Sequence, residues 1–149
     1  MKQKLFFLLR VSLALVFIVS GAMKLMEPYQ NFLAVVYKYK ILSGWTAKAF
    51  AGAIPWVELI LGVFLLKGLW TRFSLSVLWL LNCSFIAALG SALWRKLPIT
   101  ECGCFGDKAS LPLDKVLILD IGLWFVFAAL FFFLKHAKWL SIDGYFDKK

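Results

Sequence analysis

Acidic residues and histidine are scarce in this sequence. Eight Asp and Glu stand against 17 Lys and Arg, so the net charge is +9, and His136 is the only histidine. A strongly basic chain suggests nucleic acid as a partner, but the basic residues stand at the ends of apolar runs and form no basic stripe. We therefore expect no nucleic-acid binding. Anionic lipid headgroups are the partners that these positions indicate.

Cysteine is also rare, and the three that are present differ in their surroundings. Three cysteines cannot form a multi-disulfide framework. Cys83 lies within an apolar run near the expected bilayer centre, where a free cysteine packs as a small apolar side chain. Cys102 and Cys104 instead share a polar loop. This pair is the strongest candidate for chemistry in the chain.

Apolar residues, by contrast, are abundant. They make up 62% of the sequence, and the mean hydropathy is +0.84, more apolar surface than a small soluble core could bury. A bilayer core requires about 20 mostly apolar helical residues. Four stretches qualify, at residues 5–23, 49–66, 73–94 and 116–134. The sequence predicts an all-α fold, an integral membrane four-helix bundle in which residues 1–149 form a single domain.

The segment between the first two spans has a helical pattern of its own. Within residues 29–48, Phe32, Val35, Val36 and Tyr39 recur at helical spacing beside lysines. This pattern predicts an amphipathic helix at the outer membrane interface. We expect an interfacial anchor, with a substrate lid as the alternative.

The charges in the connections predict an orientation. Lys67 and Arg72 flank a tight turn between the second and third spans, and basic residues favour the cytoplasmic side. We expect both termini in the cytoplasm, the cysteine loop outside, and a location in the bacterial cytoplasmic (inner) membrane. The alternative for the first span is a cleaved signal peptide with Ser20-Gly21-Ala22 at its end, although Arg10 interrupts the apolar run.

The cysteine loop has features that favour thiol exchange. Gly103 separates Cys102 from Cys104 and permits a tight turn in which the two sulfurs face each other. A disulfide across one residue closes almost no loop, and strained disulfides are more oxidising than structural ones. Nearby basic residues, including Arg95 and Lys108, favour the reactive thiolate. We expect a redox pair, with metal binding or a structural pair as alternatives.

Polar residues within the spans are the second candidate site. Buried charges require partners, and Lys24 at the end of the first span is placed to pair with Glu58 in the second. Such a pair either fixes helix register or handles protons during redox turnover. Asp120 enters the bilayer from the same side. We expect Asn82 to hydrogen-bond between helices, the alternative being a quinone ligand.

A soft-metal site is a further alternative. Met23 and Met26 stand near the outer surface, and with Cys102 and Cys104 they would offer four sulfur ligands to Cu(I). Methionine at the end of a span also serves packing. His136 lies at the opposite end and is not expected to contribute.

Three motifs together resemble the MauE/DoxX family of redox-associated membrane proteins, over nearly the whole chain. They are Cys102-Gly103-Cys104-Phe105-Gly106 after the third span, Gly21-x-x-Lys24-Leu25 with Pro28 at the end of the first, and Pro55-Trp56-x-Glu58-x-x-x-Gly62 in the second. The resemblance implies a four-helix membrane protein in extracytoplasmic thiol chemistry, as the MauE branch performs in maturing a disulfide-rich amine dehydrogenase. The implied partner is an extracytoplasmic thiol or thioredoxin-like protein, or a larger membrane complex.

The architecture is also similar to that of DsbB and vitamin K epoxide reductase, in which a four-helix bundle passes thiol electrons to quinone. This similarity implies quinone as a cofactor. The chain lacks their second cysteine pair, so a partner must supply or remove the electrons. We expect a thiol-disulfide oxidoreductase or its membrane component. The alternatives are a non-enzymatic assembly or copper-handling subunit and a purely structural subunit.

Overall fold

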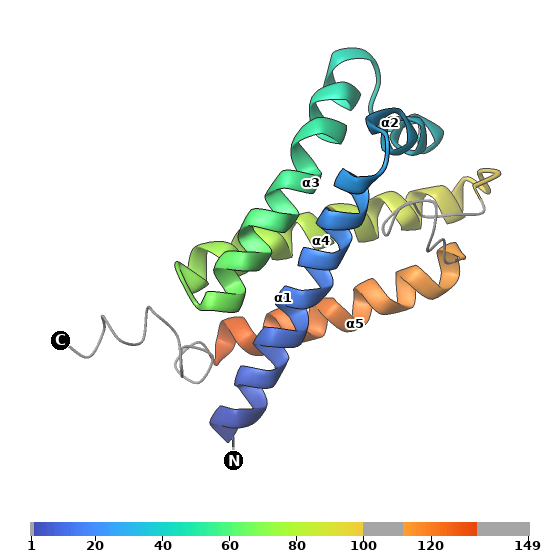
Figure 1. The fold of residues 1–149 in the computed structure, drawn as a ribbon. Helices are drawn as coiled ribbons and strands as arrows, with labels where there is room; N and C mark the ends of the chain where they lie inside the picture. Colours follow the sequence, from blue (N-terminus) through green and yellow to red (C-terminus); the bar gives the residue numbers. More distant parts are fainter. Residues whose placement is uncertain (1, 100–111, 134–149) are drawn as a thin grey trace.

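The chain forms five helices, shown in Figure 1 in a computed structural model that describes residues 2–99 and 112–133. Four of the helices are long and apolar enough to cross a membrane. This confirms the prediction of an all-α membrane helical bundle. The helices are α1 (Lys2–Met26), α2 (Tyr29–Lys38), α3 (Gly44–Lys67), α4 (Thr71–Trp94) and α5 (Leu113–Phe132).

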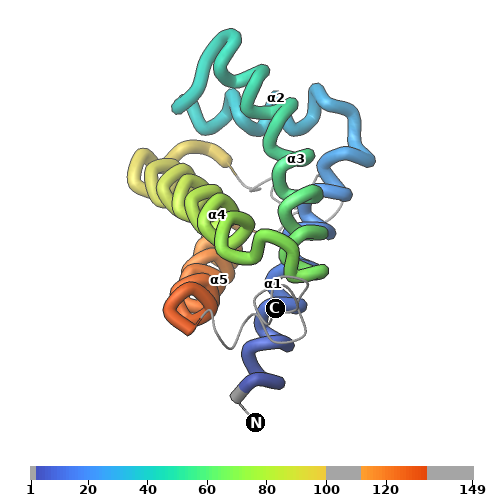
Figure 2. The backbone as a smooth tube through the Cα atoms, turned by 90° about the vertical axis from the view of Figure 1, so that its left-hand side faces the viewer, coloured from blue at the N-terminus to red at the C-terminus, as the bar shows by residue number. Residues whose placement is uncertain are grey.

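The four long helices pack as two pairs. The most extensive packing is between α1 and α3, followed by that between α4 and α5. The two pairs cross obliquely, as the two views of Figures 1 and 2 show. The shared core lies where they cross, and there the rings of Phe17 and Phe127 meet edge to face with centroids 5.7 Å apart. The core therefore joins the first span to the last.

A three-residue turn joins α3 to α4, as the basic turn in the sequence predicted. Gly68 takes a left-handed conformation with φ +68°, which glycine adopts without steric cost. Its N–H donates to the carbonyl of Leu65, and the N–H of Leu69 donates to that of Phe64, so the free carbonyls of the last helical turn are satisfied. From this turn α3 and α4 diverge as the two arms of a V (Figure 1).

The segment at residues 29–48 differs from the single interfacial helix that was expected. Only α2 is an independent helix there, and it buries Phe32, Val35 and Val36 on one face. The helical periodicity ends at Tyr39, after which Lys40 takes a left-handed conformation and the chain turns back. Residues from Gly44 onward already belong to α3, which therefore begins five residues before the predicted span.

The two ends of the bundle are distinct. The end that carries α2, the C-terminal ends of α1 and α4 and the start of α5 is called the α2 end, and the opposite end is called the turn end. Many large apolar side chains between the ends are exposed, as a lipid-facing surface requires. Trp45 and Trp94 are exposed at the α2 end and Trp70 at the turn end, at the positions of aromatic belts.

Candidate functional site

A buried ion pair joins the first two spans. The ammonium of Lys24 donates to both carboxylate oxygens of Glu58 at 2.8 Å and to the hydroxyl oxygen of Ser20 at 3.1 Å. The Ser20 hydroxyl in turn donates to Glu58 at 3.0 Å. Lys24 is 3% exposed and Glu58 is fully buried. The predicted pairing of Lys24 with Glu58 is confirmed, and Ser20 completes it as a third member.

Two glycines bring the helices close enough for this pair to form. A Cβ on Gly21 would lie 2.7 Å from the carbonyl oxygen of Pro55 and 2.9 Å from the backbone nitrogen of Leu59. A Cβ on Gly62 would lie 2.8 Å from a side-chain carbon of Ile18. Both positions thus require a residue without a side chain. The glycines of the two helical motifs hold α1 against α3 and so position the ion pair.

Alanine at Gly21 is expected to lower the free energy of unfolding by about 1–3 kcal/mol, the usual cost of overpacking. The added methyl would meet backbone atoms, which cannot move aside independently. Gly122→Ala on α5 is the matched control, because nothing lies within 4 Å of its Cβ position. Denaturant unfolding in detergent micelles measures both. Equal stability of the two variants would contradict the close approach.

The charge of Lys24 also contacts two aromatic rings. Its ammonium lies 5.1 Å from the ring centroid of Phe32 on α2 and 5.0 Å from that of Phe85 on α4. Both distances lie within the range of cation–π attraction, which strengthens in desolvated sites. Lys24 therefore connects α1, α2, α3 and α4 at a single point.

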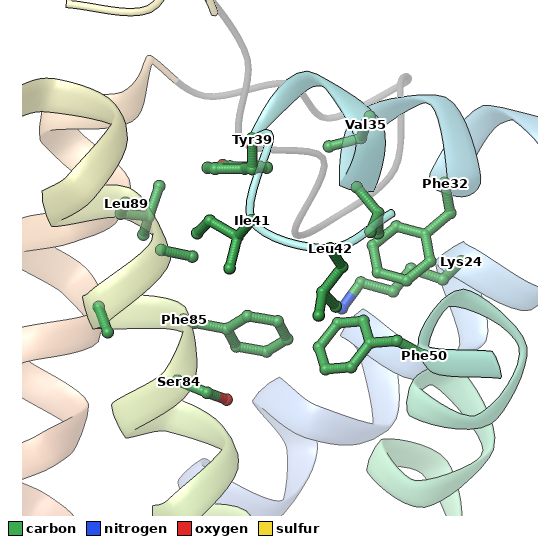
Figure 3. A pocket seen from close by; sticks show the side chains of 13 residues that line it. Lys24, Phe32, Val35, Tyr39, Ile41, Leu42, Phe50, Ser84, Phe85 and Leu89 are labelled. Carbon is green, nitrogen blue, oxygen red and sulfur yellow. The ribbon is translucent and has the colours of Figure 1, made fainter. Parts of the chain in front are cut away.

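An apolar cavity of about 390 Å³ opens beside Lys24 at the α2 end. Figure 3 shows the rings of Phe50 and Phe85 pointing toward one another into it from α3 and α4. Within the part of the chain that the structure describes, Lys24 is the one charged residue of this lining. The cavity is lined by Lys24, Phe32, Val35, Val36, Tyr39, Ile41, Leu42, Phe50, Ser84, Phe85, Ala87, Ala88 and Leu89.

Tyr39 links this cavity to the ends of the cysteine loop. Its ring packs with Leu97 and Ile99 against a small apolar cluster from α4 and α5. Its carbonyl accepts a hydrogen bond of 2.6 Å from the guanidinium of Arg95. Burial raises the pKa of Tyr39 to about 12, and the negative charge of Asp120 adds to this effect. The phenol therefore keeps its proton at neutral pH.

A second, smaller cavity of about 20 Å³ lies deeper between the spans. Its lining brings together Ser20, Glu58, Asn82 and Asp120, together with Phe85, which also lines the larger cavity. The predicted interhelical hydrogen bond of Asn82 is absent among the described residues, since neither amide atom has a partner there. The reason is that this side chain faces the cavity.

The remaining candidate residues are more scattered. Cys102, Gly103, Cys104, Phe105, Gly106 and His136 lie outside the described residues. Cys83 is a free, half-buried thiol within α4. Met23 is half-buried, whereas Met26 is 85% exposed at the end of α1. Arg10 is fully buried, with its guanidinium 5.3 Å from the ring centroid of Phe7.

Sequence reasoning missed Ser20, Phe32 and Phe85 as parts of the site. Ser20 precedes Lys24 by four residues, and residues four apart share one face of a helix, so this spacing was a readable signal. The two phenylalanines are ordinary members of apolar runs. The contact of Phe32 with Lys24 depends on how α2 folds back and that of Phe85 on how α4 packs against α1, which local patterns do not encode.

Comparison with known proteins gives one result. The family model described as methylamine utilisation protein MauE matches residues 2–139, nearly the whole chain. No match was found among curated proteins or among solved structures. The match confirms the MauE resemblance and agrees with the four apolar helices. The chain therefore belongs to the MauE family and is an integral membrane protein associated with methylamine utilisation.

Proposed function

We propose that this chain is a membrane thiol-disulfide redox protein. Cys102 and Cys104 exchange electrons or disulfides with an extracytoplasmic thiol or thioredoxin-like partner, and a quinone in the larger cavity is the electron acceptor. In this proposal both termini are cytoplasmic in the bacterial inner membrane, and the α2 end faces outward. The observation that carries the proposal is the apolar cavity at the end of the bundle from which the cysteine loop departs.

The cavity suits the head of a quinone. Its volume of about 390 Å³ lies within the usual range for ligand pockets, and such pockets combine apolar and aromatic walls with few polar groups. The rings of Phe50 and Phe85 offer flat surfaces for a flat ligand (Figure 3). The positive charge of Lys24 would stabilise negative charge that develops on a quinone oxygen.

Covalent geometry bears on the distance between Cys102 and the cavity. Cys102 follows Ile99 by three residues, and a chain of three residues spans at most about 10 Å. Ile99 packs in the same cluster as Tyr39, which lines the cavity. Covalent geometry therefore limits how far Cys102 can be from the cavity wall.

The chemistry balances without a further reagent. In the oxidising direction two thiols lose their S–H bonds, one S–S bond forms, and two electrons with two protons convert quinone to quinol. Exchange with the partner then passes the disulfide on and returns the two thiols to this chain. In that exchange a thiolate of the partner attacks one of the two cysteines, the sulfur of the other leaves as a thiolate, and a second thiol of the partner resolves the mixed disulfide. In the reverse direction one of the two cysteines attacks a disulfide of the partner and the other resolves the adduct.

Filling the cavity is expected to slow reoxidation of the reduced cysteines by ubiquinone about tenfold or more, which corresponds to at least about 1.4 kcal/mol in activation free energy. Ala88→Phe places a ring in the cavity lining. Leu80→Phe is the matched control, since Leu80 lies on the same helix but is exposed to lipid. Thiol alkylation at timed intervals in proteoliposomes measures the rate.

Two results would count against the proposal. One is an unchanged rate of reoxidation in folded Ala88→Phe protein, which would show that the cavity takes no part in the reaction. The other is failure of ubiquinone to reoxidise the wild-type pair at all, which would remove quinone as the electron acceptor. The lipid-facing control separates both results from a general effect of added bulk.

A further inference from the structure

The smaller cavity has one polar side chain from each of the four spans in its lining, beside apolar residues. Ser20 comes from α1, Glu58 from α3, Asn82 from α4 and Asp120 from α5. We call these four residues the polar junction. The cavity measures about 20 Å³, and roughly 10–15 Å³ is enough to hold one water molecule. The site therefore has room for one small occupant.

The charges at the polar junction do not balance. Lys24 contributes one positive charge, whereas Glu58 and Asp120 contribute two carboxylates. Asp120 interacts electrostatically with both of the others. Tyr39, the titratable group that faces Asp120 from the segment after α2, keeps its proton and adds no positive charge. Arg10 precedes Ser20 by ten residues, about 15 Å along the helix axis.

Glu58 is satisfied as an anion. Both its oxygens accept hydrogen bonds from Lys24, and one also accepts from Ser20. Asp120 differs, because its Oδ2 has no hydrogen-bond partner among the described residues although the residue is only 7% exposed. An isolated charge inside a bilayer is costly, and a carboxylate in that position is stabilised by taking up a proton.

The side chain of Asn82 independently indicates that the smaller cavity holds a bound molecule. It is 1% exposed, and neither its amide oxygen nor its amide nitrogen has a hydrogen-bond partner within the part of the chain described. Buried polar groups almost always have partners, and ordered water is the usual one where protein groups are missing. The amide lines the same cavity as Asp120.

We propose that the polar junction binds one exchangeable proton, carried by Asp120, and one water molecule that bridges the amide of Asn82 and the carboxyl group of Asp120. The single proton brings the cluster to neutrality with Lys24 and Glu58. A metal ion is disfavoured because the residues described contain no group of three or more His, Cys, Asp or Glu side chains arranged to hold one.

The proposed proton lies close to the larger cavity. Phe85 lines both cavities, and Lys24 contacts the larger cavity while it holds Glu58 at the smaller one. Phe85 and the Lys24–Glu58 pair therefore stand between a ligand in the larger cavity and the polar side chains of the smaller one. The inference does not depend on the cysteines, so it stands or falls separately from thiol exchange.

Infrared spectroscopy of the full chain in lipid nanodiscs tests the proposal. A protonated carboxylic acid has a carbonyl stretching band that an ionised carboxylate lacks. We expect this band at neutral pH and a shift of the band in deuterated water. Asp120→Asn should abolish it, and Asp114→Asn, the same change at an exposed position of α5, should leave it unchanged. Carboxyl-labelled aspartate assigns the band in unsubstituted protein even if Asp120→Asn fails to fold.

The water molecule is tested at Asn82. Asn82→Leu should move the band to higher frequency, because the hydrogen bond that weakens the carbonyl is lost. Ser76→Ala on the same helix is the control, since this exposed hydroxyl donates to the carbonyl of Arg72 and does not line the smaller cavity. An unmoved band in Asn82→Leu would overturn the water bridge.

Three other results would contradict the proposed proton on Asp120. They are the absence of the band from wild-type protein, its persistence in Asp120→Asn, and its assignment to glutamate by labelling. A bound sodium ion would show itself differently, as thermal stability that rises with sodium chloride but not with choline chloride and that loses this dependence in Asp120→Asn. That outcome would replace the proton by a metal ion.

Discussion

Replacing Glu58 by alanine is expected to lower the free energy of unfolding by about 3–5 kcal/mol, because it leaves the buried ammonium of Lys24 without its counterion. Lys24 is 3% exposed, so water cannot replace the lost carboxylate without opening the helix packing. Unfolding in mixed micelles of increasing denaturing detergent measures the change. Lys4→Met, at an exposed position of α1, should change stability by less than about 0.5 kcal/mol.

A double variant distinguishes the contribution of the ion pair to stability from the cost of leaving one charge without its partner. Lys24→Met with Glu58→Leu removes both charges and keeps similar volume, and such replacements of buried ion pairs are often neutral or stabilising. The double variant should therefore be far more stable than either single variant. Additive losses from the two changes would show that the charges do not depend on each other, contrary to the 2.8 Å contacts.

The same double variant distinguishes a structural role from a chemical one. If the pair only fixes the register of α1 against α3, the folded double variant should reoxidise its cysteines at the wild-type rate. We expect the rate to fall instead, because the charge beside the larger cavity is gone. A normal rate would assign the pair to helix packing alone.

Alanine at either loop cysteine is expected to abolish disulfide formation within the chain completely, since no second pair can replace it. One of the two variants, Cys102→Ala or Cys104→Ala, should also accumulate a mixed disulfide with the oxidised partner, because the remaining thiol can attack the partner's disulfide while the cysteine that would resolve the adduct is missing. Non-reducing electrophoresis of membranes after acid quenching shows the adduct as a heavier band. Mass spectrometry of that band identifies the partner.

Cys83 provides the control within the same chain. It is a half-buried free thiol eleven residues before Trp94, which is about 16 Å along the helix from the end of α4. Cys83→Ala should therefore leave exchange unchanged. If neither loop variant forms an adduct and the double variant Cys102→Ser with Cys104→Ser supports full function in cells, thiol exchange is not the role of this chain.

Much of the fold was readable because each membrane span carries its own signal. Hydropathy located all four long helices, and the cost of a buried charge was enough to pair Lys24 with Glu58. The turn at Gly68 followed from the short basic connection. These features depend on residues close in sequence or on a choice among very few possible partners.

The site itself was less predictable. The larger cavity is lined by α2, by the segment after it and by the diverging arms α3 and α4, and no local pattern in the sequence indicates how far these arms diverge. Asn82 was expected to bond a neighbouring helix, yet it faces a cavity. One polar residue on an apolar helix indicates that a partner is needed, but the helix rotation decides whether that partner is protein or water.

The shape of the larger cavity depends on the angle of the V formed by α3 and α4. The two arms follow one another in the chain through the short turn at Gly68 (Figure 1), while the cavity lies between their opposite ends, near Phe50 and Phe85. The width of the cavity therefore depends on the angle between the two arms, which meet at the turn near the opposite membrane face. A substitution at the turn that changed this angle would alter the shape of the cavity on the other side of the bilayer without touching its lining.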